Sequence, residues 1–342
     1  MQIEPNESIL AFFKRCRRNL NDTRLNDFLD RRAVPGQERY LQRRLKQAGA
    51  QEFDGPEASW PGLFLPASFW LDNPYHRNVT QQLMDLQLPE YHTEVFAGHR
   101  LFNLDAVQPD RNRELMDWMK LRALDQDVTT LVLQEDEIDW MLDAPSEIAT
   151  NDPYAAKAHG SVITFGLGIG YFLYMALRNP NVAHVTVIER NEAVIDRFQE
   201  YLLPLFPDHE RITIQHADAF DIWEAEQLSA YDYIYADIWQ SGEDGLFRIH
   251  ELLEQAVPDF ANTDFWIEDS CVVPLRTLIF LHFEELLNGT TRPVHPDYES
   301  MMNNVRRWFA GRNDTISDPD QLKDDLYDRQ VLRSILGGKT CA

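Results

Sequence analysis

Val162-Ile163-Thr164-Phe165-Gly166-Leu167-Gly168-Ile169-Gly170-Tyr171 is the stretch of sequence that decides the fold. The chain contains 15 glycines, and three of them alternate here directly after an apolar run. Glycine lets a backbone turn sharply and lets a ligand approach the main chain closely. A buried strand, a glycine turn and a helix in this order predict a nucleotide-binding corner.

The spacing of these glycines argues against a dinucleotide. A dinucleotide-binding turn follows G-x-G-x-x-G, whereas Gly166, Gly168 and Gly170 follow G-x-G-x-G. Tyr171 stands where the third glycine of the dinucleotide pattern would fall. This spacing suits a backbone that passes close to a nucleoside without binding a pyrophosphate.

Strands and helices alternate over residues 151–290, which predicts a parallel sheet with crossover helices. The predicted strands are 161–165, 182–188, 212–215, 231–236 and 264–267, and the helices between them begin near Tyr171, Asn191, Ile222 and Gly245. We therefore expect an α/β fold with a Rossmann-like sheet and helices on both of its faces.

Acidic residues follow three of the predicted strands. Glu189 ends the second strand, where a carboxylate is placed to accept hydrogen bonds from both hydroxyls of a ribose. Asp218, followed by Ala219, comes after the third strand and is placed to accept a hydrogen bond from an exocyclic amine such as that of adenine. The carboxyl ends of parallel strands meet at one edge of a sheet, so these side chains are expected in one site.

Asp237 follows the fourth strand and is predicted to face the reacting end of the ligand. A carboxylate there could hold an acceptor or take its proton. Tyr235 and Trp239 flank it and are candidates for an aromatic wall of the substrate pocket, which would stabilise a positive charge by cation–π contact.

Residues 161–239 resemble class I S-adenosylmethionine-dependent methyltransferases, and within them the spermidine-synthase-like branch. Residues 133–141 look like the strand–turn–strand that precedes the core in polyamine aminopropyltransferases, and residues 231–247 are similar to their active-site strand and loop. The resemblance implies S-adenosyl-L-methionine as the cofactor and Asp237 as the catalytic residue. It implies these cofactor-binding residues: Gly166, Gly168, Gly170, Glu189, Asp218, Ala219 and Asp237.

Departures from that branch leave the reaction open. Aminopropyltransferases carry an acid inside the glycine turn, where this chain has Ile169, and a second acid shortly after the fourth-strand aspartate, where residues 237–241 read Asp-Ile-Trp-Gln-Ser. We expect a methyltransferase whose acceptor is a small molecule or a protein side chain. The alternatives are a polyamine aminopropyltransferase that uses decarboxylated S-adenosylmethionine, and a non-catalytic cofactor-binding protein.

Composition limits the partners. The chain has 342 residues and a net charge of −24, and a strongly acidic surface repels polyanions, which argues against nucleic acid. Its three cysteines predict neither a disulfide framework nor a zinc site, and no metal is expected. The longest uncharged apolar stretch, 161–177, contains the glycine turn, so no membrane span is predicted. We expect a cytoplasmic protein, and the resemblance leaves a homodimer open.

Three regions are predicted along the chain. Residues 1–125 form a mostly helical N-terminal region, expected to cover the cofactor and select the substrate. Within it, 91–96 and 99–104 suggest a hairpin about Ala97-Gly98, and 112–124 suggest a helix. Residues 126–290 form the cofactor-binding domain, which begins with a strand at 128–133. Residues 291–342 form a C-terminal extension with helices at 298–310 and 319–336.

Overall fold

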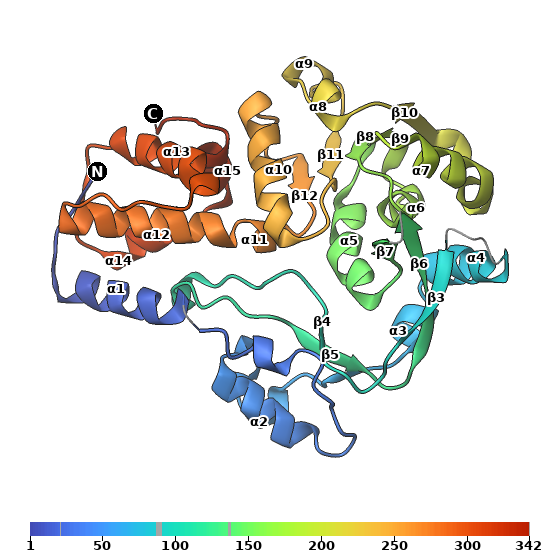
Figure 1. Cartoon of the computed structure of the whole chain (residues 1–342), viewed down its shortest axis with the longest axis horizontal. Coiled ribbons are helices and arrows are strands. Elements are labelled where there is room, and N and C mark those ends of the chain that lie inside the picture. The colour runs from blue at the N-terminus through green and yellow to red at the C-terminus, as the bar shows by residue number, and fades with distance from the viewer. Residues whose placement is uncertain (21, 87–90, 136–137, 342) are drawn as a thin grey trace.

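The computed structural model describes residues 1–20, 22–86, 91–135 and 138–341. The largest sheet among these residues has five parallel strands (Figure 1). The strand order is β10-β9-β8-β11-β12. The strands are β8 (Gly160–Phe165), β9 (Val182–Glu189), β10 (Ile212–His216), β11 (Tyr233–Ala236) and β12 (Thr263–Phe265). The order reverses between β8 and β11, as in open Rossmann-like sheets, whose ligands bind at that point.

Both faces of the sheet are buried. In β8, Ile163 and Phe165 enter one hydrophobic cluster, whereas Val162 enters a second cluster. Tyr233 and Tyr235 of β11 join that second cluster, because successive side chains of a strand point to opposite faces. Strands covered on both faces are near-continuous apolar runs, which is why residues 162–165 and 233–236 are so apolar in sequence.

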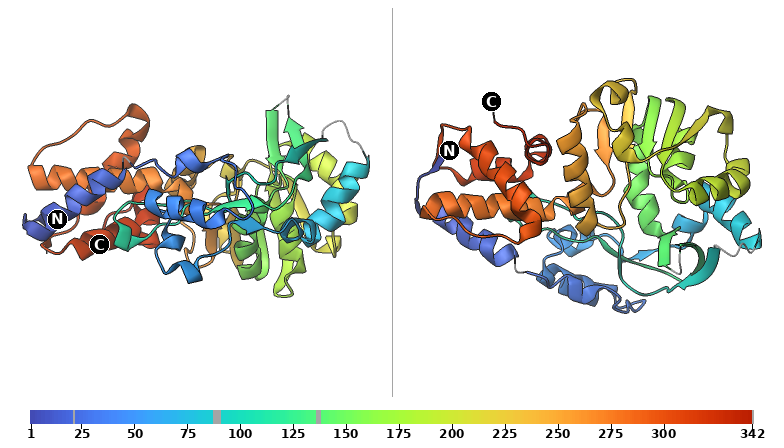
Figure 2. Two further views of the ribbon diagram at one scale, coloured as in Figure 1. Left: turned by 90° about the horizontal axis from the view of Figure 1, so that it is seen from below. Right: turned by 45° about the horizontal axis from the view of Figure 1, so that its top comes forward.

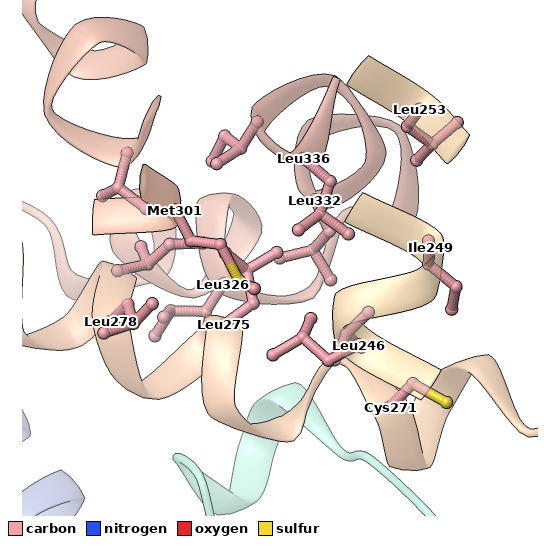
Figure 3. Packing of buried hydrophobic residues seen from close by; sticks show 14 of the residues in the cluster. Leu246, Ile249, Leu253, Cys271, Leu275, Leu278, Met301, Leu326, Leu332 and Leu336 are labelled. Carbon is pink, nitrogen blue, oxygen red and sulfur yellow. The ribbon is translucent and has the colours of Figure 1, made fainter. Parts of the chain in front are cut away.

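Helices cover the two faces separately. On the face of Tyr233 and Tyr235 pack α5 (Pro145–Lys157), α6 (Tyr171–Arg178) and α7 (Glu192–Arg197). On the other face packs α10 (Gly242–Gln255), whose apolar side chains meet the C-terminal helices (Figure 3). The predicted α/β class is confirmed at this level: a parallel sheet with helices on both faces.

Two helix starts differ from the prediction because capping groups decide them. The helix expected near Ile222 is α8 (Ala219–Ile222), which begins directly after Asp218, and α9 (Ala225–Leu228) follows it. The helix expected near Gly245 begins at Gly242, because Ser241 and Asp244 form a capping box around the helix N-terminus.

The two ends of the chain lie together (Figures 1 and 2). Strand β1 (Gln2–Ile3) pairs in parallel with β13 (Thr315–Ile316), and α1 (Glu7–Leu20) packs in one cluster with the C-terminal helices. These helices are α11 (Glu268–Cys271), α12 (Val273–Asn288), α13 (Glu299–Ala310), α14 (Pro319–Tyr327) and α15 (Arg329–Leu336). The single helix expected over 319–336 is therefore wrong: Asp328 interrupts it and caps α15 through the backbone N–H groups of Gln330 and Val331.

The predicted hairpin over 91–104 is also wrong. Strand β3 (Tyr91–Phe96) pairs antiparallel with β6 (Val128–Glu135), whose other edge pairs with β7 (Ile138–Leu142). Strand β4 (Phe102–Asn103) instead pairs with β5 (Leu121–Leu124), which also pairs with β2 (Phe64–Leu65). The turn segment that contains Gly98 contacts Asp127, whose Oδ1 accepts a hydrogen bond from the Gly98 N–H at 2.8 Å.

The helix predicted over 112–124 does not form either. Only Arg111–Arg113 makes a short 3-10 turn, and residues 121–124 are strand β5. Glu114 and Leu115 both have positive φ values, of 54° and 66°, which no α-helix can contain. Asp117, two residues after Leu115, forms an ion pair with the distant residue Arg276, with 2.5 Å between Arg276 Nη2 and Asp117 Oδ2.

The remaining α-helices of the N-terminal region are α2 (Glu38–Ala48), α3 (Ser68–Leu71) and α4 (Gln81–Leu86). Gly49 ends α2 in the left-handed conformation, a common helix stop. In the part of the chain that the structure describes, no helix is long and apolar enough to cross a bilayer.

Candidate functional site

A cavity of about 550 Å³ opens at the carboxyl ends of the central strands. Its size is within the usual range for small-ligand sites. Eight of the nine predicted site residues line it: Gly166, Gly168, Glu189, Asp218, Ala219, Tyr235, Asp237 and Trp239. Gly170 is not among the lining residues.

The three glycines of the turn allow a left-handed backbone, and two of them, Gly166 and Gly170, also allow close packing. All have positive φ, at +93° for Gly166, +51° for Gly168 and +78° for Gly170, a conformation that favours glycine. At Gly166 an added β-carbon would lie 2.0 Å from the backbone oxygen of Asp237. At Gly170 it would lie 2.9 Å from the rings of Phe198 and Phe206, so this glycine allows packing beneath α6.

Glu189 is fixed by the backbone on both sides of it. Its Oε2 accepts a hydrogen bond from the Leu167 N–H at 3.0 Å, and its Oε1 accepts one from the Asn191 N–H at 2.8 Å. The carboxylate therefore ties the end of β9 to the glycine turn. Each oxygen keeps a second lone pair, so this geometry is compatible with a ribose diol as a further donor.

Asp218 has a structural contact as well as a place in the cavity wall. Its Oδ1 accepts a hydrogen bond from the Phe220 N–H at 2.9 Å and so caps α8. Ala219 and Phe220 line the cavity beside it. The adenine-binding role predicted for Asp218 stays a prediction.

Two carboxyl groups with raised pKa values line the cavity, and the sequence pointed to only one of them as a site residue. Asp237 directly follows β11, where its N–H donates to the Phe165 carbonyl at 2.9 Å. Glu147 lies in the first turn of α5 and lines the same cavity. Burial raises the pKa of Asp237 to about 8. Burial, together with the charges of Asp237 and Asp143, raises the pKa of Glu147 to about 8.

Asn151 links Glu147 to the sheet. Its Nδ2 donates to Glu147 Oε2 at 3.0 Å, and its Oδ1 accepts from the Tyr235 hydroxyl at 2.8 Å. Glu147 and Asn151 are four residues apart on α5, so they share one helix face. That spacing was the only sequence signal for this pair, and it does not reveal that the face points towards Asp237.

The two predicted aromatic residues differ in their surroundings. Tyr235 is fully buried and stacks on Phe172 with ring centroids 4.0 Å apart, so its ring belongs mainly to the core. Trp239 is 6% exposed and lines the cavity. Its indole Nε1 has no hydrogen-bond partner among the described residues.

Two residues of the N-terminal region form hydrogen bonds with the glycine turn and with the start of α6. The hydroxyl of Tyr75 donates to the Ile169 carbonyl at 2.5 Å, and both residues are buried. Asn73 donates to the Tyr171 hydroxyl at 2.9 Å, and that hydroxyl donates to Asp152 Oδ1 at 2.7 Å. These contacts are not predictable from the sequence, because nothing local relates residues 73–75 to residues 169–171.

Carboxyl groups outnumber basic side chains in the lining of the cavity. Two arginines line it, Arg190 and Arg248, against these five carboxyl residues: Glu147, Glu189, Asp218, Asp237 and Asp244. A cleft lined by one sign of charge concentrates ligands of the opposite sign. The site therefore suits a ligand that carries a positive charge.

Comparison with models of protein families and with curated proteins finds no match for this chain.

Proposed function

We propose that this protein is an S-adenosylmethionine-dependent transferase that moves a methyl group to a small-molecule or protein acceptor. The observation that supports the proposal is the convergence of the glycine turn, Glu189, Asp218 and Asp237 on one acidic cavity at the strand order reversal. Class I methyltransferases, which the sequence resembles, bind their cofactor at this position. The negative lining fits the positive sulfonium of that cofactor.

Different residues of the chain would bind the ribose, the adenine and the acceptor. Glu189, already oriented by two backbone N–H groups, would accept hydrogen bonds from the ribose. Asp218, Ala219 and Phe220 would hold the adenine. S-adenosylmethionine supplies an activated methyl group when bound, so the protein needs mainly to orient the acceptor and exclude water. Asp237 would hold the acceptor and take its proton.

Isothermal titration with S-adenosylmethionine and S-adenosylhomocysteine tests the proposal. We expect dissociation constants below 1 mM for both, which corresponds to a binding free energy more favourable than about −4.1 kcal/mol. Asp218→Asn keeps a good helix cap and removes the carboxylate charge, and we expect it to weaken binding about tenfold. Asp221→Asn, an exposed acid of the same helix, is the matched control. A wild-type protein that binds neither compound contradicts the proposal.

Aminopropyl transfer is a second candidate, and one observation favours it. The sequence lacks the acids that aminopropyltransferases carry near Ile169 and after Asp237, but α5 brings the carboxyl group of Glu147 into the same cavity. Incubation with putrescine and decarboxylated S-adenosylmethionine distinguishes the two reactions. Spermidine as the product supports aminopropyl transfer, and its absence with protein shown to bind the cofactor excludes it.

A further inference from the structure

We propose that α2 and the loop before it form a docking surface for a short acidic segment of a protein partner. We call this the basic surface, and it consists of four exposed side chains: Arg31, Arg39, Arg44 and Lys46. None of the four lines the cavity at the ends of the central strands, so the proposal does not rest on the transferase function. In Figure 1, α2 lies at the lower edge of the molecule, away from the central sheet.

The charge of this segment is opposite to that of the whole chain. Residues 31–46 contain six basic residues and one acidic residue, Glu38, whereas the full chain carries 56 acidic residues against 32 basic ones. A basic area on an otherwise acidic protein attracts an anionic partner to that area and repels it elsewhere. A solvated helix face would have the same composition, so the arrangement of the side chains decides between the two.

Two of the four cations share one aromatic ring. The guanidinium carbons of Arg31 and Arg44 lie 4.8 and 5.6 Å from the centroid of the Phe28 ring. Arg31 donates from Nε to the backbone carbonyl of Asp27, and no carboxylate of the described residues lies within 4.0 Å of either guanidinium group. Two like charges on one ring repel each other. A carboxylate from another chain would pair with both and relieve that repulsion.

The other two cations are held in the same way on Trp60. Arg39 Cζ and Lys46 Nζ lie 5.9 and 5.5 Å from the centroid of its ring, and their spacing of seven residues places both on one face of α2. Arg39 donates to the backbone carbonyl of Glu57 at 2.7 Å, and Lys46 donates to that of Asp54 at 3.1 Å. These hydrogen bonds orient the cations without neutralising their charge.

One carboxylate of the chain itself already binds beside this surface. Glu57 accepts two hydrogen bonds from Arg43, at 2.7 and 2.9 Å, in a bidentate pair. The hydrogen bond to Arg43 lowers the pKa of Glu57, and the nearby charges of Arg39 and Lys46 act in the same direction. A carboxylate is thus the group that these cations stabilise. The guanidinium groups of the basic surface offer the same fork to a carboxylate of another chain.

Exposed apolar side chains accompany the cations and favour a protein partner. Of the seven large hydrophobic side chains exposed in the described residues, three lie in residues 29–40: Leu29, Val34 and Tyr40. Tyr40 is 63% exposed, and tyrosine is enriched at protein–protein interfaces. A peptide that carries both acidic and apolar side chains would contact both kinds of group.

The size of the basic surface suits a short segment. Helix α2 has 11 residues, so it is roughly 16 Å long, and about five residues of an extended peptide would run along it. A long nucleic acid would continue beyond α2 over a protein whose net charge is −24, which repels it. The observations therefore favour an acidic peptide segment over a nucleic acid.

Fluorescence anisotropy with a labelled peptide tests the proposal on the full chain. The probe is a fluorescein-labelled hexapeptide of four glutamates and two leucines, and the same peptide with glutamines in place of the glutamates is its neutral control. We expect the acidic peptide to bind the wild type with a dissociation constant below about 1 mM at low ionic strength. Added salt should weaken this binding, because it screens exposed charges. The neutral peptide should bind at least tenfold more weakly.

Two double variants each remove the cations of one ring, and they are Arg31→Gln/Arg44→Gln and Arg39→Gln/Lys46→Gln. Each should weaken binding of the acidic peptide at least fivefold, and far-UV circular dichroism checks that each is folded. The control is Arg178→Gln/Arg307→Gln, which removes the same charge from exposed arginines in the last turns of α6 and α13. This control should bind the peptide like the wild type.

Glu57→Gln gives a result that misfolding cannot imitate. It removes the carboxylate that pairs with Arg43, so the surface loses an anion and gains a free cation. We expect the acidic peptide to bind this variant at least twofold more tightly than the wild type. Glu226→Gln, at an exposed glutamate of α9, is the control and should leave the affinity unchanged.

Several results would overturn the proposal. The wild type could bind the acidic peptide no better than the neutral one, or Glu57→Gln could fail to strengthen binding. Folded double variants could bind the peptide like their control. A labelled single-stranded oligouridine serves as the competing probe. If it binds more tightly than the peptide and the double variants weaken only its binding, the basic surface is a nucleic-acid site and the acidic-peptide proposal is wrong.

Discussion

Gly166 lies directly against the backbone carbonyl of Asp237, so closely that a β-carbon at position 166 would be 2.0 Å from that oxygen. The contact joins the ends of β8 and β11, the two strands between which the strand order reverses. The Asp237 N–H also donates to the Phe165 carbonyl at 2.9 Å. The turn and the predicted catalytic carboxylate are therefore parts of one rigid corner.

Substitution of Gly166 by alanine is expected to destabilise the protein strongly. The new side chain would meet a backbone atom that cannot rotate away, and φ at this position is +93°. We expect the free energy of unfolding to fall by about 2–4 kcal/mol, measured by urea denaturation. Gly36→Ala is the control: φ there is +81°, but nothing lies within 4 Å, so only the backbone strain of about 1 kcal/mol is expected. Equal losses in the two variants would contradict the close contact.

Stability is expected to fall as the pH rises from about 5 towards 8. Burial raises the pKa of Glu147 and of Asp237 to about 8, so the folded state keeps protons that the unfolded state has released. Unfolding then releases protons, and the free energy of unfolding declines by up to about 1.4 kcal/mol per pH unit for each proton released.

Glu147→Gln cannot ionise and should reduce that decline. Urea denaturation at pH 5.5 and 8.5 measures it for the wild type and the variant. Glu57→Gln is the control, because Glu57 is 47% exposed and its hydrogen bond to Arg43 lowers its pKa. We expect Glu57→Gln to keep the wild-type difference between the two pH values. A Glu147→Gln protein with an unchanged difference would mean that this carboxyl group is ionised in the folded state.

Removal of the Tyr75 hydroxyl is expected to loosen the glycine turn. In Tyr75→Phe the Ile169 carbonyl loses a buried hydrogen bond, which should lower the free energy of unfolding by about 1–2 kcal/mol. The variant should also weaken cofactor binding, because Ile169 belongs to the same turn as residues 166–168, which line the cavity. Tyr40→Phe is the control, since Tyr40 is 63% exposed, and thermal unfolding should not distinguish it from the wild type. Unchanged stability of Tyr75→Phe would show that this hydrogen bond contributes nothing.

The ion pair between Arg333 and Glu268 is expected to be essential for the docking of α15. Arg333 donates from Nε and Nη2 to the two Glu268 oxygens at 2.7 Å each, and both side chains are buried. Arg333→Met leaves the buried Glu268 carboxylate with the longer contact to Arg329, which is 45% exposed and whose Nε lies 3.5 Å from Glu268 Oε2, and we expect a loss of about 3 kcal/mol in the free energy of unfolding.

Two further variants check this explanation. Arg333→Met combined with Glu268→Gln should recover part of the loss, because the buried charge that Arg329 compensates only in part is removed as well. Arg43→Met breaks the solvent-exposed pair with Glu57 and should leave the free energy of unfolding close to that of the wild type. A double variant no more stable than Arg333→Met would mean that packing of the arginine, and not its charge, holds α15.

The central sheet was predictable from the sequence because its strands β8, β9 and β11 are largely apolar runs that end at a glycine or an acid. All five strands lie where the pattern placed them, within a few residues at their ends. The N-terminal region was not predictable in the same way. Strand β3 pairs with β6, whose residues follow their partners by 32 positions or more in the sequence. Local turn signals at Ala97-Gly98 carry no information about a partner at that distance.

The sequence by itself determined the order of strands and helices in the central sheet, the glycine turn at 166–170 and the acids that follow the strands, because these depend on local pattern and on side-chain chemistry. Only the tertiary structure decided that Glu147 of α5 stands with Asp237 in one cavity, and that Tyr75 supports the turn. The physical reason is that a helix face or a hydroxyl meets its partner through the packing of elements distant in sequence. The raised pKa values of the two acids arise from that packing alone.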